Sequence, residues 1–280
     1  MAVKLIAFDL DYTLLDSEKR LSAENLAALT LAAEKGIYTV PATGRLYNGL
    51  PEEIKNLPSF RWCILGNGAR IYDAANDITA AAAEIPLADA FEIFDFMESV
   101  GLRYDCYAGD SAWIERKDFD ELDTFIEDKA TCRFIRSVRT PVDGLREFLK
   151  ANFDSILKIQ VYFEDPELRL RMLRELPERY PKLGFSSSIP VNMEINSKKA
   201  NKGAGLMMLC DYLGIDVSET AAFGDGLNDM EMIETAGIGI AMANAEEKLK
   251  AAADMITGSC EESGVAQGIR KIVLNEGKNI

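Results

Sequence analysis

The chain of 280 residues contains no histidine. This absence excludes Ser-His-Asp and Cys-His nucleophile systems, zinc sites with histidine ligands, and phosphohistidine intermediates. Any catalysis by this chain must therefore use carboxylates, lysine, arginine, cysteine, tyrosine, hydroxyl groups or a bound metal.

The chain also has fewer basic than acidic residues, no CxxC pair and no long apolar run. It has 31 basic and 46 acidic residues, a net charge of −15, which argues against nucleic acid or an anionic membrane as partner. Its five scattered cysteines are typical of free thiols in a reducing compartment. The start, MAVKLIAFDLD, does not resemble a signal peptide, and no stretch approaches the roughly 20 apolar residues of a membrane span. We expect a cytoplasmic protein; the sequence does not indicate its oligomeric state.

Short apolar runs alternate with helical patterns in the first and last thirds of the chain. Continuous apolar runs of this kind are typical of buried parallel strands, and they fall at Val3–Phe8, Ile37–Pro41, Trp62–Leu65, Thr220–Phe223 and Gly237–Met242. Ser22 is a predicted N-cap of a helix that stops at Gly36, and a second helix is expected from about Gly203 to Gly214. The alternation predicts an α/β core built on a Rossmann-like, doubly wound parallel sheet.

The middle of the chain has a different pattern and is expected to form an inserted α+β cap domain. We predict a core domain of residues 1–83 and 190–280 and an inserted domain of residues 84–189. Within the insert, helices are predicted at Phe91–Val100, Phe119–Lys129, Val142–Lys150 and Pro166–Arg179, and strands at Leu102–Tyr107, Ala112–Arg116, Cys132–Val138 and Ile156–Phe163. Trp113 and Glu194 are candidates for substrate contact, with core packing the favoured interpretation of Trp113.

Two groups of carboxylates follow predicted core strands. Asp9 and Asp11 come directly after the first strand, and Asp225 and Asp229 lie in Gly-Asp-Gly-Leu-Asn-Asp after the strand that ends at Phe223. Ligands of open α/β sheets bind beyond the carboxyl ends of the strands. Clustered carboxylates are costly without a cation, and Mg²⁺ suits carboxylate and phosphate oxygens. Each group alone has an ordinary explanation as a solvated turn or helix cap.

Phosphate-binding chemistry is present at two further places. Thr43-Gly44-Arg45 offers a hydroxyl, an accessible backbone N–H and a guanidinium at the end of the second strand. Lys202 opens a helix, where a bound anion would offset the unfavourable position of a cation. A surface arginine and a solvated basic face are the ordinary alternatives. The four motifs together supply what a metal-assisted phosphoryl site requires.

This ordered set resembles motifs I to IV of the haloacid dehalogenase (HAD) superfamily. The residues that carry the resemblance are Asp9-x-Asp11-x-Thr13, Thr43-Gly44-Arg45, Lys202 and Gly224-Asp225-Gly226-x-Asn228-Asp229. The insert, Asn67-Gly68-Ala69 and the ending Ala253-Asp254…Gly264-Val265-Ala266 resemble the Cof-like, type IIB (C2-cap) phosphatases, so the resemblance covers essentially the whole chain. The chain departs from the family at Tyr12, where relatives often carry glycine and where a tyrosine is expected to narrow the loop, and at Ser259–Glu262.

The resemblance implies a role for each motif residue. Asp9 would be the nucleophile that forms an aspartyl-phosphate, and Asp11 the general acid and base. Phosphate would be held by the Leu10 backbone N–H, Thr43, Gly44, Arg45, Lys202 and Asn228. Mg²⁺ would be held by Asp9, the Asp11 backbone carbonyl and Asp225, with Asp229 in its outer shell.

The implied function is a Mg²⁺-dependent phosphatase of small phosphorylated metabolites, with sugar phosphates ranked first. A phosphomutase of the same superfamily, similar to phosphomannomutases, stays open because no residue separates the two. A phosphorylatable signalling module similar to a receiver domain is disfavoured, because such a module needs only about 120 residues and no insert. A catalytically silent binding protein is disfavoured because every chemical position is present.

Overall fold

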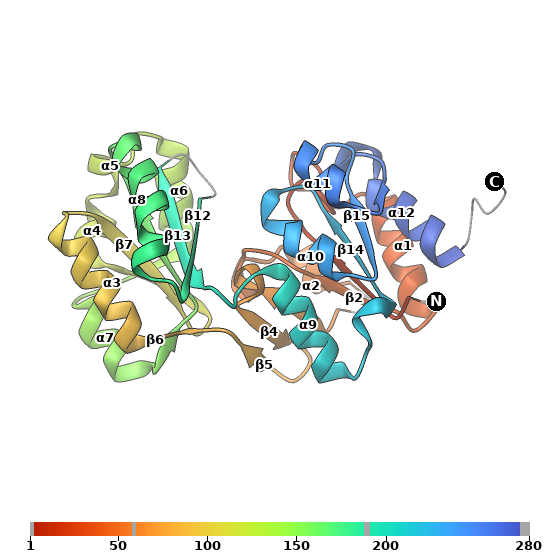
Figure 1. Ribbon diagram of the computed structural model, residues 1–280, viewed down its shortest axis with the longest axis horizontal. Coiled ribbons are helices and arrows are strands. Elements are labelled where there is room, and N and C mark those ends of the chain that lie inside the picture. The colour runs from red at the N-terminus through yellow and green to blue at the C-terminus, as the bar shows by residue number, and fades with distance from the viewer. Residues whose placement is uncertain (1–2, 58–59, 188–190, 275–280) are drawn as a thin grey trace. The chain divides into compact units, whose positions relative to one another are not determined.

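The computed structural model describes residues 3–57, 60–187 and 191–274. The chain divides into two compact units, one formed by Met1–Ala82 with Asn201–Ile280 and the other by Ala83–Ala200 (Figure 1). Within the described ranges, no helix combines the length and apolar character that crossing a membrane requires.

The first unit is built on a parallel sheet in the order β16-β15-β14-β1-β2. Its strands are β1 (Leu5–Phe8), β2 (Tyr38–Pro41), β14 (Thr220–Gly224), β15 (Ile238–Ala241) and β16 (Met255–Ile256). All four side chains of β1 are fully buried, as expected of a central strand covered on both faces. The α/β class and the doubly wound parallel sheet predicted from the sequence are confirmed.

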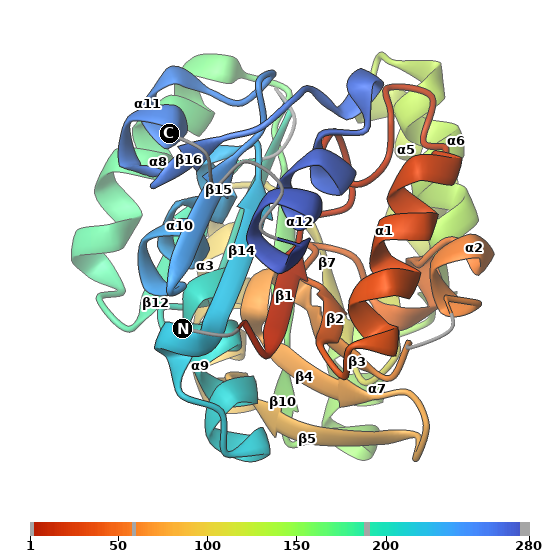
Figure 2. The same ribbon diagram turned by 90° about the vertical axis from the view of Figure 1, so that its right-hand side faces the viewer.

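Helices cover both faces of this sheet. They are α1 (Ala23–Glu34), α2 (Glu52–Lys55), α9 (Lys202–Leu213), α10 (Met230–Thr235), α11 (Glu247–Ala252) and α12 (Gly264–Leu274). Figures 1 and 2 show α1 and α12 on one face and α9 and α10 on the other. Ser22 caps α1 as predicted, since its side chain accepts from the Asn25 backbone N–H, and Asn201 caps α9 in the same way through Ala204 N–H.

A short antiparallel sheet adjoins the edge of the parallel one. It contains β3 (Trp62–Leu65), β4 (Arg70–Asp73) and β5 (Ile78–Ala82), in that order. We expected Trp62–Leu65 to be a parallel core strand. Its ladder with β4 is antiparallel, whereas its bridge to the main sheet, from Ile64 to Ala42, is parallel, and Thr43 N–H donates to the Ile64 carbonyl there at 2.9 Å.

The second unit is an α+β fold around a sheet in the order β12-β13-β11-β7-β8-β9. Its strands are β7 (Arg103–Ala108), β8 (Ser111–Glu115), β9 (Arg139–Val142), β11 (Lys158–Tyr162), β12 (Leu183–Ser186) and β13 (Asn192–Ser197), with a separate pair β6 (Ile85–Pro86) and β10 (Ser155–Ile156). Its helices are α3 (Leu87–Ser99), α4 (Arg116–Asp120), α5 (Leu122–Phe125), α6 (Lys129–Val138), α7 (Leu145–Asn152) and α8 (Pro166–Arg179). Helices α3, α7 and α8 share an apolar core with β7, β11 and β13.

Two predictions for the insert are wrong. Cys132–Val138, expected to be a strand, lies in helix α6. Its buried residues Cys132 and Ile135 are three positions apart, a helical spacing, and the Asp128 carboxylate accepts from Thr131 N–H at the start of the helix. The helix expected over Phe119–Lys129 is instead divided into α4 and α5, which meet at Glu121, and α5 ends where the backbone becomes extended at Ile126.

The second boundary of the insert lies beyond the predicted one. Strand β13 pairs with β11 and β12 and therefore belongs to the second unit, so the chain returns to the first unit at Asn201. The predicted boundary residue Pro190 lies outside the described residues. The first boundary falls after Ala82.

Candidate active site

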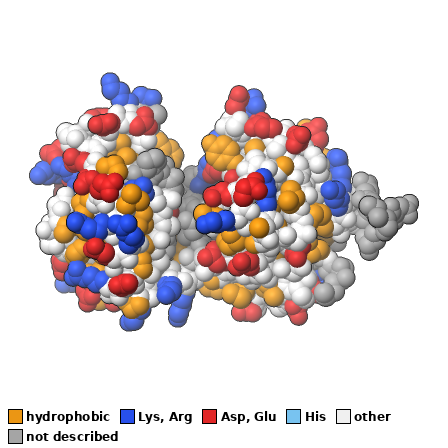
Figure 3. Space-filling model, turned by 45° about the horizontal axis from the view of Figure 1, so that its top comes forward, with side chains coloured by type: hydrophobic (Ala, Val, Ile, Leu, Met, Phe, Trp, Pro, Cys, Tyr) orange, Lys and Arg blue, Asp and Glu red, His pale blue; other side chains and the backbone are white. Residues whose placement is uncertain are grey.

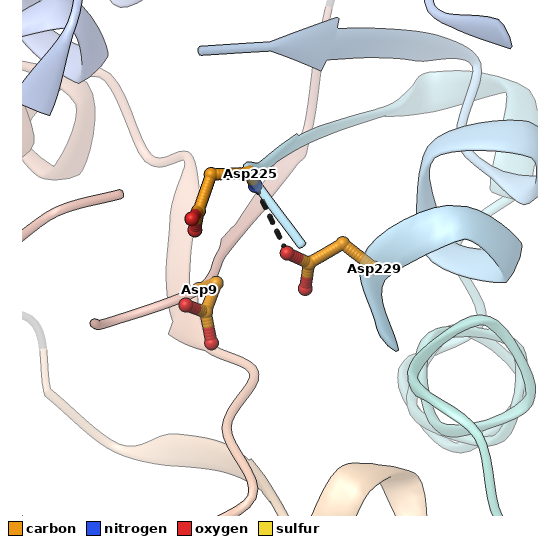
Figure 4. Close-up of side chains that lie close together, drawn as sticks. All are labelled: Asp9, Asp225 and Asp229. Carbon is orange, nitrogen blue, oxygen red and sulfur yellow. Dashed lines mark hydrogen bonds between the residues drawn. The ribbon is translucent and has the colours of Figure 1, made fainter. Parts of the chain in front are cut away.

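Strand geometry brings the two acidic motifs together. β1 and β14 are adjacent and parallel, with Phe8 opposite Phe223, so Asp9 and Asp225 leave neighbouring strands at the same edge of the sheet. Asp9 N–H continues the ladder by donating to the Phe223 carbonyl at 3.0 Å. One carboxylate oxygen from each of Asp9, Asp225 and Asp229 lies within 4.8 Å of the other two, and Figure 4 shows the three side chains converging.

A short loop holds Asp229 in this cluster. Asp229 Oδ2 accepts from the backbone N–H groups of Asp225, at 3.0 Å, and Gly226, at 3.1 Å. Gly224 makes this close approach possible, because a Cβ at that position would lie 2.5 Å from the Cβ of Asp229. Asp229 is completely buried, and Asp9 is nearly so.

Lys202 supplies the positive charge at the base of the cluster. Its ammonium is completely buried and lies 2.6 Å from Asp9 Oδ1 and 2.6 Å from Asp229 Oδ1. Burial alone would lower the pKa of Lys202, but the charges of Asp229 and Asp9 raise it above its ordinary value of 10.5. The lysine is therefore held in its charged form.

One lysine does not balance three carboxylates. Burial, reinforced by the charges of Asp229 and Asp225 and opposed by Lys202, raises the pKa of Asp9 to about 7. Burial likewise raises the pKa of Asp225 to about 6, against a 2.7 Å hydrogen bond donated by Thr13 Oγ1. These all-oxygen donors with uncompensated negative charge fit a hard divalent cation such as Mg²⁺. The sequence offered no role for Thr13, although it lies within the first motif.

Asp11 stands apart from the other aspartates. Its carboxylate is not part of the three-residue cluster and binds Arg45. The Arg45 Nε lies 3.0 Å from Asp11 Oδ2, and a terminal guanidinium nitrogen lies 2.6 Å from Asp11 Oδ1. Lys19 adds a third contact at 3.0 Å. Burial alone would raise the pKa of Asp11, but Arg45 and Lys19 bring it below its ordinary value of 3.8. Sequence reasoning missed this pairing and gave no signal for Lys19, which no motif contains.

The predicted phosphate-binding residues differ in their burial and in their contacts. Thr43 is buried and its Oγ1 accepts from Arg45 N–H at 3.2 Å, while Gly44 passes close to the Asn67 side chain. The Leu10 side chain lies in the core, and Asn228 is exposed. Because the Arg45 guanidinium binds Asp11 and the Gly49 carbonyl, its contact with phosphate stays a prediction.

The two candidate substrate contacts of the second unit, Trp113 and Glu194, both make contacts within that unit. Trp113 packs against Phe148 and Phe153 and donates its indole N–H to the Ala108 carbonyl, which confirms core packing. Glu194 is buried and its carboxylate lies 3.0 Å from the buried ammonium of Lys158.

Comparison with known proteins agrees with this fold and site. The sequence profile of the haloacid dehalogenase-like hydrolases matches residues 6–269, so the chain belongs to that family. Among its relatives are two proteins of Bacillus subtilis, each 32% identical. Phosphatase YwpJ aligns over 97% of this chain and 100% of its own length. The 5-amino-6-(5-phospho-D-ribitylamino)uracil phosphatase YcsE aligns over 97% of this chain and 96% of its own.

The solved structures agree at the level of the fold. The crystal structure of a haloacid dehalogenase-like hydrolase from Bacteroides thetaiotaomicron superposes with a TM-score of 0.81 at 28% identity, covering 96% of this chain and 99% of the other. The chain is thus a hydrolase of the phosphatase type within this superfamily.

Proposed function

We propose that this protein is a Mg²⁺-dependent phosphatase that hydrolyses small phosphorylated metabolites, sugar phosphates first among them, through a phosphorylated Asp9. The observation that carries the proposal is the convergence of Asp9, Asp225 and Asp229 around Lys202 at the carboxyl ends of β1 and β14. The relatives named as phosphatases support the reaction class.

The ion would be held by Asp9, Asp225 and the Asp11 carbonyl, with Asp229 behind them; when bound, it neutralises the acids and polarises the phosphate. Lys202 orients the Asp9 carboxylate and neutralises part of the charge that an anionic ester would meet. Thr43, Gly44 and the Leu10 N–H would hold phosphate oxygens, and Asn228 would add a donor from the last motif.

Two aspartates would share the chemistry that histidine often performs. An Asp9 oxygen attacks phosphorus, the bond from phosphorus to the ester oxygen breaks, and Asp11 gives a proton to the leaving alkoxide. Because Arg45 and Lys19 hold Asp11 ionised in the substrate-free protein, Asp11 would take up that proton from solvent as the anionic ester binds. Asp11 then takes a proton from water, the resulting hydroxide attacks the phosphorylated Asp9, and inorganic phosphate leaves. The inserted unit would act as a cap that excludes water and selects the leaving group.

Phosphate release from a panel of phosphate esters tests the proposal. The wild type is expected to turn over in Mg²⁺, to lose activity in excess EDTA and to recover it when Mg²⁺ is returned. Asp9→Asn should lower kcat by roughly 10³-fold or more, because an amide cannot serve as the nucleophile. Asp211→Asn, the same change at an exposed position on α9, is the matched control. Full activity of Asp9→Asn, or undiminished activity in EDTA, would contradict the proposal.

The phosphomutase alternative predicts a different product. A mutase returns the phosphoryl group to the sugar and interconverts the 1- and 6-phosphates without net release of phosphate. Measuring both reactions on one hexose phosphate decides between the two.

A further inference from the structure

Tyr12 lies between Asp11 and Thr13 in a backbone conformation that a tyrosine seldom adopts. Its φ is 63°, in the left-handed region, where a bulky residue is an outlier and glycine is favoured. The conformation is fixed from outside the loop, since Asn244 Nδ2 donates to the Tyr12 carbonyl at 2.9 Å.

The strain is not offset by burial of the ring. Tyr12 is 47% exposed, whereas the flanking Leu10 and Thr13 side chains are fully buried. A phenol that contributes little to the core, in a strained backbone conformation, points to a role outside packing.

The exposed ring is held beside the proposed general acid. The Lys19 ammonium lies 3.7 Å from the centre of the Tyr12 ring and 3.0 Å from Asp11 Oδ1, so ring and carboxylate contact the same cation. In the proposed reaction Asp11 protonates the leaving oxygen. The alcohol attached to that oxygen is therefore the part of the substrate closest to the ring.

We propose that Tyr12 determines specificity by favouring phosphate esters whose alcohol carries a closed ring, either a sugar ring or a heterocycle. A closed ring presents a pre-formed face to the rigid phenol, the C–H groups of a sugar or the π face of a heterocycle, whereas an acyclic chain loses rotational freedom on making the same contact. This inference rests on the proposed phosphatase function and deepens it.

The test compares a cyclic and an acyclic substrate that differ in ring closure and in the two hydrogens added on reduction of C1. Glucose 6-phosphate and glucitol 6-phosphate have the same carbon number and the same primary ester, one with a ring and one with an open chain. The measured quantity is the ratio of their kcat/KM values, which a general loss of folding or of catalysis does not move.

Tyr12→Gly should lower this cyclic-to-acyclic ratio by roughly two- to tenfold, the range of one aromatic contact. The variant should fold, because glycine adopts this φ without strain. Tyr12→Phe should keep the wild-type ratio, and so should Tyr212→Ala, a change at another exposed tyrosine of the same unit.

Two outcomes contradict different statements. An unchanged ratio in Tyr12→Gly, or equal loss on both substrates, would overturn the role of Tyr12 while leaving the phosphatase intact. Absence of Mg²⁺-dependent phosphate release by the wild type from every ester of the panel would overturn the proposed function itself.

Discussion

At the scale of single residues, the site depends on three buried charged groups that stabilise one another. Lys202 is the buried counter-ion of both Asp9 and Asp229, and all three are removed from water. Such a triad contributes little net stability while intact, but losing one member leaves uncompensated charge in the interior. Lys202 is thus a structural element of the site as well as a candidate phosphate ligand.

Lys202→Met should lower the free energy of unfolding by about 3 kcal/mol or more in metal-free buffer, because Asp9 and Asp229 lose their only shared cation contact among the described residues. Urea denaturation measures the change. Lys199→Met, the same substitution at an exposed lysine just before α9, should stay within about 0.5 kcal/mol of wild type. Equal stability of the two variants would show that the triad is not coupled to folding.

At the scale of elements, the β3–β4 hairpin has its own ionic anchor. The Asp73 carboxylate accepts from Arg61 at 2.9 and 3.1 Å, from Asn76 Nδ2 at 2.7 Å and from Ala75 N–H at 3.1 Å. The hydrogen bonds from Arg61, opposed by burial and reinforced by Asn76, hold the pKa of Asp73 below its ordinary value of 3.8. The hairpin is therefore tied down at the end of β4.

Asp73→Asn should cost about 1 kcal/mol of stability at pH 7, and the cost should shrink in acid. A lowered pKa in the folded state stabilises the protein above the unfolded pKa and is lost as pH falls through the folded value. Unfolding of wild type and variant compared from pH 7 to below pH 4 measures this, with Asp211→Asn as control. A difference that stays constant across this range would contradict the ionic anchor.

Elements that depend on local signals were predictable from the sequence. Ser22, Gly36 and the buried run before Asp9 specify their helix and strand through caps and continuous apolar residues. Helix α6 was not predictable, because the spacing of its apolar residues Cys132, Phe134 and Ile135 fits both the strand and the helix period. Only tertiary packing buries Cys132 and Ile135 and leaves Phe134 exposed.

The site, too, has residues whose placement was predictable from the sequence and contacts that were not. Asp9, Asp225 and Asp229 were predictable as a cluster because they follow strands that a parallel sheet aligns. The contacts of Asp11 with Lys19 and Arg45, and of Thr13 with Asp225, join residues from different loops and were not. Only the folded arrangement of those loops brings the side chains within hydrogen-bonding distance.

At the scale of the whole molecule, the net charge of −15 adds to the repulsion that the acidic cluster exerts on an anionic substrate. Acidic and basic side chains are interspersed over both units on the face shown in Figure 3, so the excess negative charge is not gathered into one patch there. An anionic ester would thus approach a protein of like charge and a cluster of aspartates. A bound cation and Lys202 are what make such a site accept phosphate.

Mg²⁺ should raise the thermal stability of the entire protein, because an ion that binds only the folded cluster stabilises it by mass action. At about 100 times its dissociation constant the ion adds roughly 2.7 kcal/mol. Thermal unfolding in Mg²⁺ and in EDTA measures the effect, and Asp225→Asn should reduce it while Asp211→Asn should not. Equal Mg²⁺ responses of these two variants would place the ion elsewhere.

The central claim is that Asp9 becomes phosphorylated, and trapping that species tests it most directly. With an aryl phosphate, whose leaving group needs no proton, Asp11→Asn should form the phosphorylated enzyme and hydrolyse it slowly, because the base that activates water is missing. The variant is mixed with substrate and Mg²⁺, quenched, reduced with borohydride and mapped by mass spectrometry. The account predicts that residue 9 is recovered as homoserine, the product of reducing an acyl phosphate. Phosphate release without modification of residue 9, or modification at another carboxylate, would contradict it.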